Sequence, residues 1–250
     1  MSDGIGDADV KDGISRCPDI ETSSNGYARR FAGVAGQFFL TRQEYLVAKA
    51  LAGMPATTLL DVGGGHAQLS GPMAAAGWAV TVVGSTHDCA DRLRLDSRNV
   101  RTRFIAGDLL ALPFEAQSFS TVVSVRTMAH IEEWPQFVGE LCRVARDRVV
   151  IDYPELMSLN LVSLASFGLK RRIEGDTRRF RTFRRQTIAA AFERHGFRVR
   201  SAHGQFVLPM ALHRAAGGAA PLRAAEAAFA AIGLTNRFGN PGIICAESIR

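Results

Sequence analysis

The sequence predicts an α/β fold in which helices cover both faces of a mostly parallel sheet. Two observations carry this prediction. From residue 58 onward, short apolar runs alternate with helical patterns. The first run is apolar almost throughout, as in a strand that is buried on both faces. At 250 residues and 47% hydrophobic composition, the chain is long enough to bury such a core in one domain.

Seven segments have the length and composition of strands. They are short, apolar and separated by turn residues or by helical patterns. The expected strands are residues 58–62, 79–83, 102–106, 118–125, 148–152, 197–205 and 242–249. We expect all seven to belong to one sheet.

Helical patterns fill most of the gaps between these strands. Gly77 and Gly196 follow two of them as expected C-terminal caps, and Pro135 suits the first turn of a third. The expected helices are residues 69–76, 89–95, 135–144 and 187–195, with one or two more within 25–51 before the first strand. Residues 211–231 predict one further helix, because Leu222, Ala225, Ala228, Phe229 and Ile232 recur at helical spacing.

The chain is expected to form a single domain over residues 23–250, preceded by a disordered tail. Residues 1–22 are polar and lack the apolar stretch of a signal peptide, so the folded part should begin near Ser23. Residues 23–55 and the insertion 153–183 should lie near the carboxyl ends of the strands, where ligands bind in open α/β sheets. We interpret both as parts of a lid.

Composition excludes several classes of protein. No stretch is long and apolar enough to cross a membrane, and we expect a cytoplasmic protein. The cysteines lack the spacing of a zinc site or a disulfide framework, so no metal is predicted. They are Cys17, Cys89, Cys142 and Cys245.

The glycine run after the first strand predicts a nucleoside-cofactor site. Gly63, Gly64 and Gly65 allow a tight turn that a ligand can approach closely. A dinucleotide fingerprint would need a glycine where Gln68 stands and an acid near the end of the second strand, where Gly84 stands. Both are missing, which disfavours a dinucleotide.

The acid Asp61, two residues before the first glycine, completes a D-x-G-x-G pattern. This resembles the first motif of the class I S-adenosylmethionine-dependent methyltransferases, most closely the type 11 small-molecule enzymes. The resemblance implies a Rossmann-like seven-stranded sheet whose last strand is antiparallel. It also implies that Asp61 helps to hold the amino group of the cofactor, while Gly63 and Gly65 face its methionine part and Gly64 permits the same approach.

Two later blocks strengthen the resemblance. Residues 104–109 (FIAGDL) match the block of the third strand, which implies that Asp108 binds the adenine amino group and Leu109 packs on the ring. Residues 125–131 (VRTMAHI) match the segment after the fourth strand, and Arg126 is assigned to the cofactor site with it. The family's ribose-binding acid is replaced by Gly84, so Ser85, Thr86 or Asp88 would have to substitute for it.

The catalytic residue is weakly encoded, because methyl transfer needs alignment, exclusion of water and at times removal of a proton. His130 is the best candidate for a general base, since the resemblance places the end of the fourth strand opposite the methyl group and imidazole titrates near neutral pH. The alternative is a structural histidine. Tyr27, Arg30 and Tyr153 are secondary candidates for a lid or a substrate wall.

The insertion bears on the acceptor. Its first half is apolar, and its second half carries most of the net charge of +6. The basic residues are Lys170, Arg171, Arg172, Arg178, Arg179, Arg181, Arg184 and Arg185. A solvated helix face and an anion-binding surface both fit such a cluster. Nucleic acid is disfavoured, because the N/D-P-P-Y/F and Pro-Cys motifs are absent.

We therefore predict methyl transfer to a small or medium organic acceptor that is acidic or has an apolar body. Whether oxygen, nitrogen or carbon is methylated stays open, as does the oligomeric state. Two other functions also stay open: a non-catalytic S-adenosylmethionine-binding or partner protein, and an NAD(P)-dependent oxidoreductase.

Overall fold

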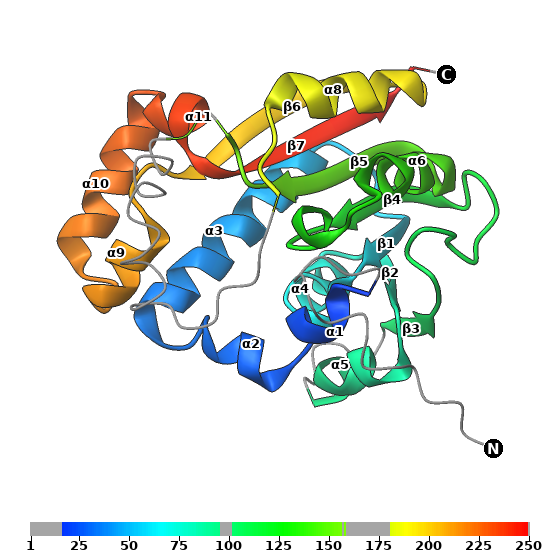
Figure 1. Cartoon of the computed structure of the whole chain (residues 1–250), viewed down its shortest axis with the longest axis horizontal. Helices are drawn as coiled ribbons and strands as arrows, with labels where there is room; N and C mark the ends of the chain where they lie inside the picture. The colour runs from blue at the N-terminus through cyan, green and yellow to red at the C-terminus, as the bar shows by residue number, and fades with distance from the viewer. Residues whose placement is uncertain (1–16, 96–101, 157, 159–180, 250) are drawn as a thin grey trace.

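The computed structural model describes residues 17–95, 102–156, 158 and 181–249, and it contains one seven-stranded sheet (Figure 1). Strands β3, β2, β1, β4 and β5 are parallel, and β7 lies antiparallel between β5 and β6. The strands are β1 (Thr58–Val62), β2 (Ala79–Gly84), β3 (Arg103–Ala106), β4 (Phe119–Ser124), β5 (Ala145–Tyr153), β6 (Phe197–Phe206) and β7 (Asn240–Ser248). The predicted fold class is confirmed, with the antiparallel last strand, and every expected strand is present.

The sheet is buried on both faces because its side chains alternate between two core clusters. Leu60 and Val149 point to a face covered by α6 (Trp134–Val144) and α8 (Arg185–Arg194). Their neighbours Leu59 and Val150 point to the opposite face, covered by α3 (Gly33–Leu51) and α4 (Ser70–Ala75). This explains why the strand segments are apolar without the alternation of a half-exposed sheet.

The folded part of the chain begins earlier than Ser23. A short helix, α1 (Asp19–Thr22), precedes α2 (Asn25–Arg29), and Asp19 is fully buried. In Figure 1 α1 lies near β1 and β2, and it contacts the turns that follow these two strands. The expected tail therefore contributes a buried acid, which its polar composition does not reveal.

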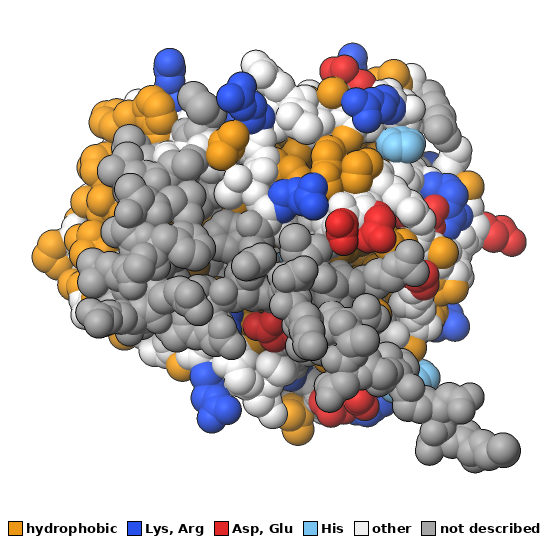
Figure 2. Space-filling model, viewed as in Figure 1, with side chains coloured by type: hydrophobic (Ala, Val, Ile, Leu, Met, Phe, Trp, Pro, Cys, Tyr) orange, Lys and Arg blue, Asp and Glu red, His pale blue; other side chains and the backbone are white. Residues whose placement is uncertain are grey.

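The prediction of one helix over 211–231 is wrong. The chain forms α9 (Met210–Ala215) and α10 (Ala220–Ala231), separated by Gly217 and Gly218 in the left-handed conformation at φ 59° and 73°. A third short helix, α11 (Leu234–Phe238), follows. Ile232, expected on the buried face, is 70% exposed. Figure 2 shows hydrophobic side chains gathered over the side of the molecule where Figure 1 places α10.

The insertion expected at 153–183 lies largely outside the described residues, and with it most of the basic cluster. Among its described members, Arg181 and Arg184 are exposed. Arg185 begins α8 and lies 3.7 Å from the carboxylate of Glu155. Across the described ranges, no helix combines the length and the apolar character needed to cross a membrane.

Candidate cofactor-binding site

The glycine turn after β1 is closely packed on all sides. Gly63 adopts φ 74°, which favours glycine, and its N–H donates to the carbonyl of Val83 at the end of β2 (2.8 Å). A β-carbon on Gly63 would lie 3.0 Å from Cγ2 of Thr127, and one on Gly65 would lie 2.9 Å from Cβ of Ser23. Side chains are therefore excluded from these positions of the turn.

Asp61 is a buried acid in need of a partner. Its side chain is 1% exposed, and neither carboxylate oxygen accepts a hydrogen bond from the described part of the chain. Burial raises its pKa to about 7, although the nearby charge of Arg126 acts in the opposite direction. Buried polar groups in proteins are almost always hydrogen-bonded. The position thus fits a positively charged donor supplied by a ligand.

Arg126 supplies a cation at the same edge of the sheet, two residues after β4. Its guanidinium carbon lies 4.9 Å from the ring centre of Phe31, and its buried Nη1 has no partner among the described residues. Burial lowers its pKa. Its backbone N–H donates to Asp152 (2.5 Å), whose other oxygen accepts from Gln43 (2.7 Å). An anion and a cation with unused hydrogen-bonding atoms suit a zwitterionic ligand, such as an amino acid group.

His66 joins this site, although the sequence reasoning used only the glycines before it. Its ring packs edge-on against Tyr27 and Phe31, with ring centres 5.8 and 5.5 Å away. Burial lowers its pKa to about 2, and the charges of Arg126 and Arg92 act in the same direction, so the imidazole is neutral. Neither ring nitrogen has a hydrogen-bond partner among the described residues. The sequence feature that could have indicated His66 as a site residue is its position directly after the three glycines.

Comparison with known proteins identifies the domain that carries this site. Residues 60–151 match a family model described as a methyltransferase domain. The chain contains a class I methyltransferase domain. No curated protein matches it. The match includes the strand of Asp61, the glycine turn and the segment with His130, whereas the N-terminal helices lie outside it.

Solved structures show the same fold over nearly the whole chain. A magnesium protoporphyrin IX methyltransferase from Synechocystis PCC 6803 with bound S-adenosylhomocysteine is 16% identical, with a TM-score of 0.63 over 91% of this chain and 96% of that one. A possible histamine N-methyltransferase from Thermotoga maritima is 14% identical, with a TM-score of 0.66 over 93% and 99%. The predicted family, fold and cofactor class, S-adenosylmethionine, are confirmed.

In this methyltransferase domain, the end of β2 carries a contact that the sequence did not predict. Ser85 and Thr86 were predicted to replace the missing acid, and their contact with the cofactor stays a prediction. In the structure, Ser85 is bound to another acid. Its N–H donates to Oδ2 of Asp19 (2.7 Å), and its hydroxyl donates to Oδ1 of the same residue. Thr86 pairs with Cys89 (3.7 Å), and Asp88 is exposed. The carboxylate of Asp19 therefore lies at the end of β2, where the sequence has Gly84 instead of an acid.

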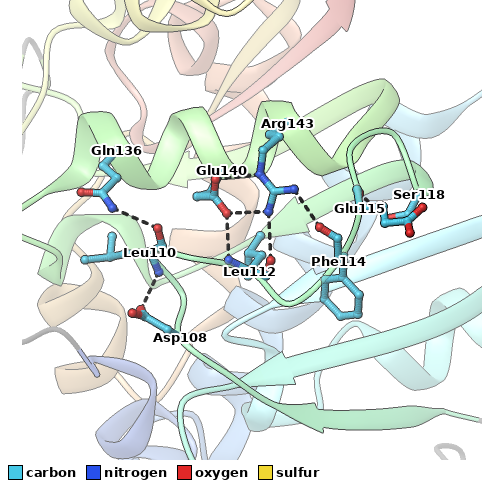
Figure 3. Close-up of polar contacts among 9 residues, drawn as sticks. All are labelled: Asp108, Leu110, Leu112, Phe114, Glu115, Ser118, Gln136, Glu140 and Arg143. Atoms are coloured by element: carbon cyan, nitrogen blue, oxygen red, sulfur yellow. Dashed lines mark hydrogen bonds and ion pairs between the residues drawn. The ribbon is translucent and has the colours of Figure 1, made fainter.

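Asp108 begins a loop that α6 holds in place (Figure 3). Asp108 itself is exposed, and its Oδ1 accepts the N–H of Leu110 (2.8 Å), as in a turn. Further along, Glu140 accepts the N–H of Leu112 (2.8 Å), and Arg143 donates to the carbonyls of Leu112 and Phe114 (2.9 and 2.7 Å). The contacts of Asp108 are those of a turn residue, and its adenine role stays a prediction.

Leu109 is 1% exposed and belongs to the core cluster beneath α6. Its predicted contact with adenine is likewise untested. Its position in the structure is that of a core side chain, which a sequence pattern does not separate from a ligand contact.

The catalytic candidate His130 ends a short helical turn, Met128–His130, just after β4. It is half-buried at the same edge as Asp61 and Arg126, where the sequence predicted it. Tyr153, a secondary candidate, lies in the core, and its hydroxyl donates to Glu155 (3.0 Å). Tyr27 instead lies over His66, with the guanidinium carbon of Arg30 5.3 Å from its ring centre. The structure therefore brings Tyr27, but not Tyr153, to the glycine turn.

Proposed function

We propose that this chain transfers a methyl group from S-adenosylmethionine to a small or medium organic acceptor. The observation that carries the proposal is the Asp61 carboxyl, which is buried beside the glycine turn with both oxygens unpartnered in the described chain. A structural acid in that position would be expected to have donors of its own. An ammonium group of a ligand supplies what the protein does not.

The residues present fit the cofactor. Asp61 would pair with the amino group of its methionine part, and Arg126 would pair with the carboxylate. Gly63, Gly64 and Gly65 let the backbone approach closely, and Asp108 remains the candidate for adenine. When bound, S-adenosylmethionine supplies an electrophilic methyl group. Leu109 and Thr86 would contribute to the adenosine part as walls of the site.

The chain's own chemistry then consists of orientation and proton removal. Holding the acceptor in line with the methyl group removes much of the entropic cost of the reaction. His130, at the end of β4, would take the proton that the acceptor loses. His66 is the other imidazole at this edge, but its very low pKa makes it a poor proton acceptor, so it would serve as a neutral wall or hydrogen-bonding group.

The identity of the acceptor is a separate question. The two neighbours are named for magnesium protoporphyrin IX and histamine, which differ greatly in size and charge. Another structural neighbour, with a TM-score of 0.56 and 17% identity, is titled a [4+2]-cyclase. Fold similarity therefore supports the cofactor site more strongly than any one acceptor. An acceptor that is acidic or has an apolar body remains our proposal.

The test has two stages. Calorimetric titration of the full chain with S-adenosylmethionine, S-adenosylhomocysteine and NADH should show binding of the first two only. A panel of organic acids, amines, phenols and apolar alcohols is then screened for S-adenosylhomocysteine formation, read as homocysteine after enzymatic hydrolysis. Turnover of one acceptor class is the expected result.

Each other result points to one alternative. Cofactor binding without turnover of any acceptor would favour a non-catalytic S-adenosylmethionine-binding protein. Binding of NADH in place of S-adenosylmethionine would overturn the proposal and favour an oxidoreductase. The variant Asp61→Asn separates the site from incidental binding, because it should lose affinity for S-adenosylmethionine by about 10-fold or more if the carboxylate meets the ammonium.

A further inference from the structure

The carboxylate of Asp19 occupies the end of β2, although the residue lies far away in the sequence. It receives the N–H of Ser85 on Oδ2 (2.7 Å) and the hydroxyl of Ser85 on Oδ1. The thiol of Cys89 also donates to Oδ2 (3.3 Å). Asp19 is fully buried, so these contacts fix its carboxylate at one place in the fold.

Gly84 makes room for this arrangement. A β-carbon at position 84 would lie 3.1 Å from Oδ2 of Asp19 and 2.8 Å from Cβ of Cys89. An acid built on β2 would therefore compete with Asp19 for the same space. The two residues are complementary. Because Gly84 has no side chain, the carboxylate of Asp19 fits at the end of β2.

An acid at the end of the second strand has a known role in nucleoside-binding α/β folds. Ligands bind outside the carboxyl ends of the strands, and an acid about 20 residues after the glycine turn binds a ribose hydroxyl. Here Gly84 stands 21 positions after Gly63, with Ser85 next to it. Oδ1 of Asp19 accepts only the Ser85 hydroxyl among the described residues, and a carboxylate oxygen can accept a second bond.

We propose that Asp19, carried by the N-terminal helix α1, binds a ribose hydroxyl of the cofactor in place of an acid on β2. This inference rests on the proposed function, because it assumes an adenosine-containing ligand. Since Asp19 is fully covered, the ribose reaches it only when α1 shifts. The helix is four residues long and contacts both the glycine turn and the turn after β2, so a ribose bound to Asp19 would lie between these two turns.

The experiment compares S-adenosylhomocysteine with its 2′-deoxy and 3′-deoxy analogues by calorimetry. The wild-type chain should prefer the ribose form over one or both analogues by about 10- to 100-fold, the range for a hydrogen bond to a charged acceptor. In Asp19→Asn that preference should fall to within about threefold. The matched control is Asp91→Asn, which removes the same charge from an exposed position at the start of helix α5 (Asp91–Leu95) and should leave the preference unchanged.

The ratio of the affinities for S-adenosylhomocysteine and its deoxy analogues distinguishes a ribose contact of Asp19 from a purely structural role. If Asp19→Asn weakens all three ligands equally, the residue only holds the fold together and the proposal is overturned. Tighter binding by the variant would mean that Asp19 blocks the site, which also overturns it. Should the variant fail to fold, Ser85→Ala is measured instead. It removes the hydroxyl that orients Asp19 and should lower the same ratio.

Failure of the proposed function gives a different signature. If the wild-type chain binds neither S-adenosylmethionine nor S-adenosylhomocysteine, the cofactor assignment itself fails. If it binds both but has no preference for the ribose hydroxyls, only the role of Asp19 fails.

Discussion

The backbone of Gly64 lies directly against the carboxylate of Asp61, and a β-carbon on the glycine would lie 2.7 Å from Oδ1 and still closer to the other oxygen. The side chain of Asp61 therefore packs directly against the turn that follows its strand. This contact explains why an acid and a glycine triplet belong to a single motif.

Gly64→Ala should therefore weaken cofactor binding and destabilise the fold. The added methyl group has to displace Asp61 or the turn, and overpacking of this kind costs about 1–3 kcal/mol. We expect at least a 10-fold loss of affinity for S-adenosylhomocysteine by calorimetry and a lower melting temperature. Gly26→Ala, in α2, is the control, because its β-carbon would meet only Ser24 Oγ at an ordinary 3.6 Å. Unchanged binding by Gly64→Ala would mean that the turn tolerates a side chain.

Asp61→Asn should make the free protein more stable while it loses the cofactor. The folded-state pKa of about 7 lies above the value near 3.9 of an unfolded chain. Ionisation of Asp61 therefore costs stability progressively as pH rises from about 4, and the full cost, at most about 4 kcal/mol, is reached above about pH 7. The asparagine variant has no such cost. Natural sites often trade stability for binding in this way.

Chemical denaturation of both proteins at pH 5 and pH 8 measures this effect. The free energy of unfolding of Asp61→Asn should exceed that of the wild type by more at pH 8 than at pH 5. Asp108→Asn serves as the control, because this carboxyl is exposed and asparagine can still accept the N–H of Leu110. A gap that does not grow with pH would show that Asp61 has a proton-independent role.

The seven strands and the position of the glycine turn could be predicted from sequence because they depend on local patterns. The run of buried residues before Gly63 and the helix after Pro135 are signals of that kind. The break between α9 and α10 was missed, since the apolar spacing that begins at Leu222 was extended back across Gly217 and Gly218, whose left-handed conformation ends the helix. Apolar spacing alone does not reveal a turn that ends a helix.

Candidate site residues could be named from the sequence only where they lie in a strand or directly after one. Asp61 lies in β1 and Arg126 follows β4, so the motif singled out both, and their contacts with a cofactor stay predictions. Asp19 is brought to β2 by tertiary packing, across 66 positions from Ser85, and no spacing rule reaches that far. His66 was overlooked because a histidine in a glycine turn has no distinctive pattern, and its aromatic neighbours Tyr27 and Phe31 come from the distant N-terminal segment.

His130→Ala should lower turnover much more than cofactor affinity. If the imidazole removes a proton from the acceptor, its loss typically costs about 100- to 10,000-fold in kcat, with less than a threefold change in S-adenosylhomocysteine binding. Steady-state kinetics and calorimetry on the same preparation measure both. His195→Ala, at the end of α8, is the control and should change neither. Equal losses in the two measurements would assign His130 a structural role.

Arg126 holds a left-handed backbone conformation, at φ 62°, that non-glycine residues rarely adopt. Arg126→Gly and Arg126→Ala remove the same guanidinium, but only glycine relieves the strain. We expect the glycine variant to be more stable than the alanine variant by about 1 kcal/mol in urea denaturation, after the greater flexibility of glycine in the unfolded chain is included.

Both Arg126 variants should lose affinity for S-adenosylmethionine to a similar degree, because the cation that pairs with the methionine carboxylate is gone from each. Calorimetry would show this as a loss of about 10-fold or more relative to wild type. The two variants thus distinguish the effect of the backbone conformation at position 126 from the effect of the arginine side chain. If the glycine variant regains stability but binds as tightly as wild type, the strain was structural and the carboxylate of the cofactor must be bound elsewhere. If alanine is the more stable of the two, the left-handed conformation is not what this position requires.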